Sequence, residues 1–440
     1  METLAGNTTY FNQTTVNPLG LLILVVLGVF TLCLPRRWAV FPFLVMACFV
    51  SSAQRIVVMS LDFNFLRILV LFGALRVFVI KREFTSFRWG RLDTAVCLWG
   101  TSSAVFYTLR LASLAGLINR LGFCFDVIGM YLLFRCLVRN WQDVDRIIKG
   151  FLCISIPLAF LFVIENRTGH NMFSIFGGVH AITMVRQGRL RCQGAFSHAI
   201  LAGCFWASVI PLFVVCWWKF NQDKIWAVIG ILAAMVIIYC CASSTPVLAV
   251  LCGGLGGCMF YLRRQMKVVR WGLLGGLFML HVSMRAPVWH LISRVGAVGG
   301  STGYHRFVLI DQAIRHFGDW GFLGCSGARV ASWGVWAGDV TNQYILEGVN
   351  GGFVTLCLFV YCILVAYSEV GKLWRRQRPH SYELKLTWAL GVCLFVHCMN
   401  FIGVSYFGQI NILWYLLLAM IGSLSLVKTK KKNVKARLAD

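Results

Sequence analysis

The chain has 440 residues, of which 59% are hydrophobic and only 13% are charged, and its mean hydropathy is +0.75. An ordinary soluble domain carries roughly 25% charged residues, so this composition excludes a soluble protein with a single anchor. The formal net charge is +25, which in a soluble protein would suggest binding to nucleic acid. In a membrane protein, Lys and Arg instead collect in the inner loops. We therefore expect membrane lipid as a partner and no nucleic acid.

Apolar segments follow one another along the chain and predict an all-α fold. We expect a polytopic transmembrane helix bundle of about 12–13 helices, at about 20 residues for each crossing. One integral membrane domain then covers residues 1–440. It contains two long extracytoplasmic loops, 165–198 and 285–341, and ends in a basic cytoplasmic tail, 428–440. The expected spans are approximately Pro18–Leu34, Trp38–Ala53, Phe65–Ile80, Thr94–Thr108, Leu121–Leu137, Gly150–Ile164, Ala199–Trp218, Ile225–Cys241, Pro246–Leu262, Trp271–Met284, Ile345–Tyr367, Leu386–Phe401 and Ile410–Val427.

The distribution of positive charge suggests an anionic ligand on the outer side. When the N-terminus is placed outside and the spans alternate, every Lys falls on the inner side and the outer loops carry Arg alone. The planar guanidinium of Arg binds phosphate or carboxylate through two parallel hydrogen bonds. The alternative is that these arginines pair with outer acids, of which Glu165, Asp311, Asp319 and Asp339 are the candidates. Composition alone leaves both interpretations open.

The first long loop concentrates arginine. Arg186, Arg189 and Arg191 lie within six positions, and Glu165 is the single acid of the loop. Three cations this close repel one another unless an anion or several acids lie among them, which favours anion binding over structural pairing. His198 ends the loop, where it can either cap the following helix or reach a substrate at the membrane surface.

The second long loop predicts an amphipathic helix from Gly303 onward. Its apolar side chains recur at steps of three and four residues, as Phe307, Ile310, Ile314 and Phe317. Ser301 or Thr302 can cap it, which places His305 and Arg306 in the first turn. A cation there opposes the helix dipole, so we expect Arg306 to have an anionic partner. Asp311 and Arg315 form an ordinary i,i+4 pair.

Charged residues within the spans are also informative. Arg67 lies near the outer end of its span and can reach the same outer cavity as the loop arginines, whereas Asp126 is expected to pair internally. No cofactor is expected. The 18 Cys form no C-x-x-C pair, no H-E-x-x-H or P-loop pattern occurs, and the acids Asp143 and Asp145 lie on the inner side, so a reaction without metal fits best.

Several stretches, in this order, resemble the bacterial O-antigen ligase and polymerase superfamily, membrane glycosyltransferases of the GT-C type, and most closely its exopolysaccharide polymerases. The resemblance covers roughly residues 60–425 and consists of LDFNFLRILV, ENRTGHNMFSIFGG, RQGRLRCQGAFSHAILAG, SSTPVLA, GGSTGYHRFVLIDQAIRHFG and DVTNQYILEGVNGG. It implies a donor glycan on undecaprenyl pyrophosphate, a glycan acceptor, and a multi-pass protein of the bacterial inner (plasma) membrane with its active site facing the periplasm or the cell exterior. Carried over to this sequence, Arg191, Arg189 and Arg306 would hold the pyrophosphate.

One position departs from the ligases that this chain resembles. They carry a His-Asn pair before the span that follows the large loop, whereas this chain has Thr341-Asn342. Asn342 matches, as a substrate-binding candidate, but a mechanism based on that His does not carry over. His305 or Asp339 can serve as the catalytic base instead. The substitution favours a polymerase over a ligase that transfers finished glycan to an acceptor. A transporter or flippase of lipid-linked glycans is the alternative from another class.

Overall fold

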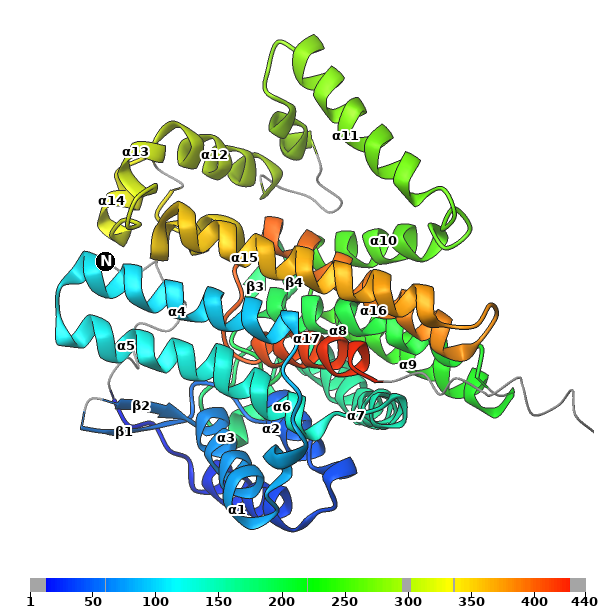
Figure 1. Cartoon of the computed structure of the whole chain (residues 1–440). Coiled ribbons are helices and arrows are strands. Elements are labelled where there is room, and N and C mark those ends of the chain that lie inside the picture. The colour runs from blue at the N-terminus through cyan, green and yellow to red at the C-terminus, as the bar shows by residue number, and fades with distance from the viewer. Residues whose placement is uncertain (1–12, 60, 220, 295–301, 335–336, 428–440) are drawn as a thin grey trace, which may run out of the picture.

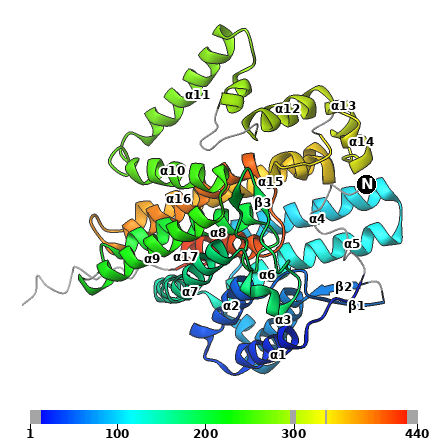
Figure 2. The same cartoon turned by 180° about the vertical axis from the view of Figure 1, so that it is seen from behind.

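The computed structural model describes residues 13–59, 61–219, 221–294, 302–334 and 337–427. The predicted tail 428–440 and the predicted cap at Ser301 lie outside these residues. Helices dominate, which confirms the all-α class (Figures 1 and 2). The described helices are α1 (Pro18–Cys33), α2 (Phe41–Phe49), α3 (Phe65–Leu75), α4 (Arg91–Leu111), α5 (Leu114–Cys124), α6 (Met130–Leu137), α7 (Trp141–Thr168), α8 (Ala199–Cys216), α9 (Asn221–Cys240), α10 (Ser244–Cys258), α11 (Met266–Ser283), α12 (Thr302–Arg315), α13 (Phe317–Trp320), α14 (Gly327–Ala331), α15 (Gln343–Arg376), α16 (Tyr382–Gly403) and α17 (Ile410–Ser425).

Short irregular elements connect these helices. Two antiparallel hairpins are described, β1 (Arg55–Val58) with β2 (Leu61–Asn64) and β3 (Val185–Arg186) with β4 (Arg189–Leu190). The short helical turns are η2 (Arg36–Trp38), η3 (Arg76–Ile80), η4 (Glu83–Ser86), η5 (Phe125–Gly129), η6 (Met172–Phe176) and η7 (Val288–Arg294). Two of them are π-helical, η3 and η5, and η5 joins α5 to α6 without a break.

Each apolar segment expected from the sequence falls on a helix, but several helices begin earlier than expected. α7 begins at Trp141 because the side chain of Asn140 accepts a hydrogen bond from the backbone N–H of Asp143 at 2.9 Å. α5 begins at Leu114 because Ser113 caps it through the N–H of Gly116. Polar caps therefore set these starts, and apolar periodicity alone does not reveal them.

Five helices are long and apolar enough to cross a membrane. They are Leu114–Leu137, Trp141–Thr168, Ala199–Cys216, Gln343–Arg376 and Tyr382–Gly403. Four shorter apolar helices accompany them, at Pro18–Cys33, Lys224–Cys240, Ser244–Cys258 and Ile410–Ser425. The expected total of about 12–13 crossings, at about 20 residues each, stays a prediction.

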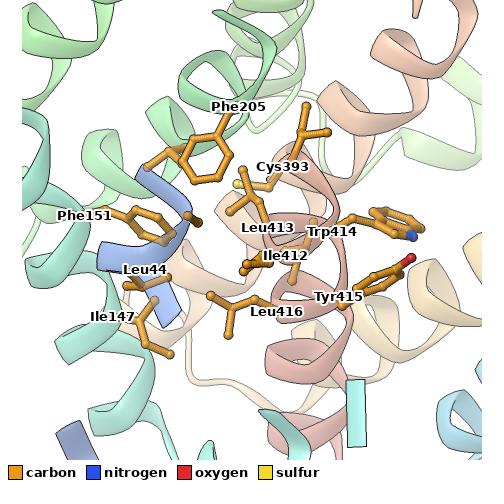
Figure 3. Packing of buried hydrophobic residues seen from close by; sticks show 14 of the residues in the cluster. Leu44, Ile147, Phe151, Phe205, Cys393, Ile412, Leu413, Trp414, Tyr415 and Leu416 are labelled. Carbon is orange, nitrogen blue, oxygen red and sulfur yellow. The ribbon is translucent and has the colours of Figure 1, made fainter. Parts of the chain in front are cut away.

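The core of the bundle surrounds α17. All residues of this helix are buried except Asn411, as expected for a helix that is apolar on every side. Leu413 and Leu416 pack in a cluster with Leu44 of α2 and Phe151 of α7 (Figure 3). α11, in contrast, buries none of its residues and projects from the bundle in both views (Figures 1 and 2).

Five connections between elements meet at one end of the bundle, which we call the site end. They are the connections α2–β1, α7–α8, α9–α10, α14–α15 and α16–α17. Ser52 contacts Ser197 through their hydroxyls at 2.8 Å, and Gln409 donates to the carbonyl of Ala195. The backbone N–H of Cys192 donates to the carbonyl of Cys240 at 3.0 Å, and Asn342 donates to the carbonyl of Ile402 at 3.1 Å. The site end therefore carries the start of α8, α10, α15 and α17, together with the end of α9 and α16. The described lysines all lie toward the opposite ends of the helices.

Candidate anion-binding site

Glu165 organises the loop that carries the first arginines. Its carboxylate is buried and accepts hydrogen bonds from the Thr183 hydroxyl at 3.1 Å and from the backbone N–H groups of Gln193 and Gly194 at 3.1 and 3.0 Å. No arginine among the described residues forms a salt bridge with this carboxylate. The alternative in which Glu165 neutralises the arginine group is therefore wrong. The acid instead fixes the path of the chain that follows Arg191.

Arg186 and Arg189 face each other across the β3–β4 hairpin. They form one registered pair, joined by Gln187 and Gly188, whose φ angles of 53° and 72° are those of a tight hairpin turn. Both arginines are exposed, and neither forms a salt bridge with a described acid. The hairpin thus presents two positive charges to solvent beside the point where the chain returns to the bundle.

Arg191 is where the chain returns, and its side chain is buried. It is 6% exposed, its Nε has no hydrogen-bond partner, and no acid within the described ranges forms a salt bridge with it. Burial lowers its pKa, and the nearby Arg186 lowers the pKa further. A buried cation without a counter-charge is costly, because desolvation is not compensated. The arrangement therefore favours an anion beside this guanidinium.

Arg306 is the second buried arginine of the site. It is 8% exposed and its Nη2 donates to the Thr245 hydroxyl at 2.6 Å. Its guanidinium lies against Gly403, where a Cβ would stand 3.3 Å from Cζ, so only glycine leaves this space. Burial lowers the pKa of Arg306, and none of the described carboxylates forms a salt bridge with it. Its local environment therefore matches that of Arg191.

The buried face of α12 differs from the expected one. Arg306, Leu309 and Ala313 are buried, whereas Ile314 is 49% exposed and Phe317 is 47% exposed and begins α13. The predicted apolar stripe is wrong in these last two members, because the helix turns Arg306 toward Thr245. The i,i+4 pair of Asp311 and Arg315 is confirmed at 2.7 Å.

The two buried arginines flank one corner of the fold, the turn from α9 to α10. The residue after Arg191 is bonded to Cys240 at one side of this turn, and Arg306 is bonded to Thr245 at the other side. His198 lies next to the same group as the N-cap of α8, where its Nδ1 accepts from the N–H of Ile200 at 3.1 Å. Burial, followed by Arg191 and Arg186, lowers the pKa of His198 to about 4. We call Arg186, Arg191, His198 and Arg306 the arginine cluster.

The two candidate bases lie close to each other beside the cluster. His305 precedes Arg306 on α12, and Asp339 lies in the segment before α15. Although Asp339 remains exposed to solvent, the surrounding protein raises its pKa, and the nearby His305 acts in the opposite direction. The structure thus brings together two residues of the large loop that lie 34 positions apart in the sequence.

Asn342 and Arg67 are engaged with protein groups. Asn342 caps α15 through the N–H of Ile345 at 3.1 Å and donates one amide N–H to the carbonyl of Ile402, so it holds the start of α15 beside Arg306. Arg67 pairs with Asp126 through two hydrogen bonds of 2.8 and 2.6 Å. This confirms the internal pairing of Asp126. Arg67 lines a cavity of about 610 Å³ with residues of α5 and the β1–β2 hairpin, and no residue of the arginine cluster lines this cavity.

Sequence reasoning missed Arg120. It is 8% exposed, its Nη2 donates to Asn350 at 3.0 Å, its guanidinium lies 3.7 Å from the ring centre of Tyr107, and its Nε has no partner. The signal that singled out Arg67, an arginine inside a span, applies here too. The expected span began at Leu121, whereas the helix begins at Leu114 after the cap at Ser113, so Arg120 fell outside the expected span.

Buried arginines divide by the end of the bundle at which they lie. Toward the lysine-bearing end, Arg76 pairs with Glu83 at 2.9 Å and Arg135 pairs with Asp93 at 2.8 Å. Toward the site end, none of the buried arginines forms a salt bridge within the described part of the chain, and these are Arg120, Arg191 and Arg306. Arg120 lies near enough to the buried Glu347 for the two charges to attract, so Arg191 and Arg306 are the buried arginines of the described residues that have no acid nearby.

No family model and no curated protein matches this sequence. Among the residues that the structure describes, no group of three or more His, Cys, Asp or Glu could hold a metal ion. The two acids predicted to lie on the inner side are engaged in ion pairs, Asp143 with Arg36 and Asp145 with Lys219. The arginine cluster and its two neighbouring candidate bases therefore form the candidate site.

Proposed function

We propose that this chain is an integral membrane glycosyltransferase. It would join oligosaccharide repeat units, carried on a lipid pyrophosphate, into a surface polysaccharide. The observation that carries the proposal is the pair of buried arginines, Arg191 and Arg306, which have no acid partner among the described residues and flank the same turn. The resemblance of the surrounding motifs to O-antigen polymerases and ligases supplies the reaction class.

Pyrophosphate fits this site in charge and in the hydrogen bonds that it can accept. Two guanidinium forks can each bind a phosphate group through parallel hydrogen bonds, and the exposed Arg186 and Arg189 would attract the anion from solvent. The lipid that carries it would remain in the bilayer, which the five long apolar helices make the natural environment of the chain. The cluster lies at the end away from the lysines, so we place it on the periplasmic or exterior side of a bacterial plasma membrane.

The reaction then follows from the charges. A hydroxyl of the acceptor glycan attacks the anomeric carbon of the donor sugar, and the bond from that carbon to the pyrophosphate oxygen breaks. Negative charge grows on the leaving oxygen, where the guanidinium groups of Arg191 and Arg306 stabilise it more than in the ground state. The proton of the attacking hydroxyl goes to Asp339 or His305, which lie close enough to influence each other.

The test is complementation of a strain from which the gene has been deleted. We expect single repeat units to accumulate on lipid and long polysaccharide to be lost, and the wild-type chain to restore the polymer. R306K keeps the charge but loses the fork, so activity should fall by about 100-fold or more with normal protein levels. R315K is the matched control, because Arg315 lies on the same helix, is exposed and pairs only with Asp311.

The other outcomes identify the alternatives. Long polymer that remains on the lipid would assign the ligase reaction. Lipid-linked units trapped on the cytoplasmic face would assign transport. An unchanged lipid pool with unchanged polymer, or full activity of R306K, would overturn the proposal.

A further inference from the structure

A second polar site lies inside the bundle, in a cavity of about 280 Å³ between α4, α5, α15, α16 and α17. Aromatic rings form much of its wall, among them Trp99 and Trp414. Trp414 and Tyr415 belong to the same buried cluster as Leu44 and Phe151 but extend from the other side of α17, where they line this cavity (Figure 3). The proposed reaction on pyrophosphate uses none of these residues.

Charged groups line the same cavity and limit what it can hold. Glu347 is buried and accepts hydrogen bonds from Trp99 Nε1 at 2.9 Å and from Gln343 Nε2 at 2.8 Å. Arg120 is more than nine-tenths buried, lines the cavity, and keeps its Nε without a partner. An isoprenoid or acyl chain would leave the Nε of Arg120 without a hydrogen-bond partner, and a polyanion would be repelled by Glu347. The cavity therefore suits a neutral molecule with many hydroxyl groups.

We infer that this cavity binds one neutral sugar ring, the terminal ring of the acceptor glycan; the inference rests on the proposed glycosyltransferase function. A pyranose combines an apolar face of C–H groups, which packs on aromatic rings, with hydroxyls that can bind the free Nε of Arg120 and the carboxylate of Glu347. The volume is at the lower limit of ligand pockets, about 300 Å³, which admits one ring and excludes a longer glycan.

The cavity adjoins the arginine cluster through two chain segments. Gln343 lines it and directly follows Asn342, which is bonded to Ile402 next to the Gly403 that contacts Arg306. Gly408 also lines it, and a Cβ at this glycine would stand 2.9 Å from the hydroxyl of Ser197, the neighbour of His198. A sugar in the cavity would thus lie beside the elements that carry the proposed donor site.

The experiment measures sugar and anion binding separately on the purified full chain in lipid nanodiscs. Saturation-transfer NMR with glucose, galactose, N-acetylglucosamine and glucuronate as probes should give a signal for at least one neutral sugar and none for glucuronate. E347Q removes the charge, and L346W fills the cavity from α15. Each should weaken the binding of the sugar by about tenfold or more, corresponding to about 1.4 kcal/mol, while binding of inorganic pyrophosphate stays unchanged.

N119L is the matched control, because Asn119 lies on the same helix as Arg120 but lines the separate cavity near Arg67. It should leave sugar binding unchanged, and thermal unfolding of each variant checks that it folds. Absence of binding by every neutral sugar, or binding that survives both E347Q and L346W, would overturn the inference. If pyrophosphate still binds and R306K abolishes that binding, the proposed function stands even where the sugar site fails.

Discussion

A buried arginine contributes to stability only when its partner is a protein group. Arg135 donates to Asp93, which is 1% exposed, and to the hydroxyl of Ser423, so its charge is balanced inside the fold. Arg191 is buried to a similar extent but has no such partner among the described residues. Selection for stability alone would not retain it, whereas selection for binding an anion would.

The first prediction compares these two arginines. R135M leaves the carboxylate of Asp93 buried and unpaired, so we expect a loss of about 3–5 kcal/mol in the free energy of unfolding. R191M removes an uncompensated cation and should leave stability equal or raised while activity is lost. Thermal unfolding of both variants in the same detergent checks this. A loss of stability in R191M as large as that in R135M would show that Arg191 is structural.

The second prediction concerns His198, whose pKa is lowered from 6.5 to about 4. Between these two values the unfolded chain holds a proton on this ring and the folded protein does not, so stability falls as the pH is lowered through this window. H198N keeps a capping side chain that does not titrate. We expect its unfolding midpoint to change less than that of the wild type between pH 6.5 and 4. Parallel curves for the two proteins would contradict the lowered pKa.

Residue type and position in the chain were enough to select the arginines of the site, but not to show which of them pair with an acid. Arg186, Arg191 and Arg306 follow from the absence of lysine on one side of the expected membrane. Sequence could not show that Arg67 is paired and Arg191 is not, because the acid that decides each case lies far along the chain. Asp126, which lies between α5 and α6, pairs with Arg67. Glu165 instead accepts hydrogen bonds from backbone N–H groups of its own loop.

At the scale of elements, a break in α15 connects the large loop to the bundle. Gly352 has φ 73° and ψ −176°, a conformation open to glycine alone. The next residue, Phe353, donates its N–H to the carbonyl of Gly321, which joins the end of α13 to the break. The sequence Gly351-Gly352 marks a weak point in a helix, but only the docked backbone of α13 determines that the helix bends there.

The third prediction uses two glycines of α15. G352A should destabilise the protein by about 2 kcal/mol or more, because the backbone conformation excludes a side chain and its Cβ would stand 2.3 Å from the carbonyl oxygen of Phe322. G371A is the control on the same helix, with nothing within 4 Å of the added Cβ, and should be neutral or stabilising by about 0.5–1 kcal/mol. Thermal unfolding measures both. Equal effects of the two changes would contradict the conformation at Gly352.

The order of apolar segments in the sequence predicted the positions of the helices well, because burial in lipid or in protein requires the same composition. The same reasoning does not distinguish a helix covered by protein from one covered by lipid. α17 reads as one more span, yet the protein surrounds it on all sides, whereas α11 reads the same way and contacts little of the bundle. Composition reports that a helix avoids water but does not identify what covers it.

At the scale of the whole molecule, the separation of charge predicts orientation. Lysines lie at one end, and the buried arginines without salt bridges lie at the other within the described residues.

A short epitope inserted after Gly188, at the tip of the exposed β3–β4 hairpin, should bind antibody in intact spheroplasts. The same epitope after His380, in the exposed turn between α15 and α16, should bind only after permeabilisation. The variant at His380 should retain the polymer, since the turn between α15 and α16 lies at the end of the bundle away from the cluster. The reverse pattern would place the arginine cluster in the cytoplasm, where nucleotide sugars are the available donors, and a lipid pyrophosphate used on the outer face could not then be the substrate.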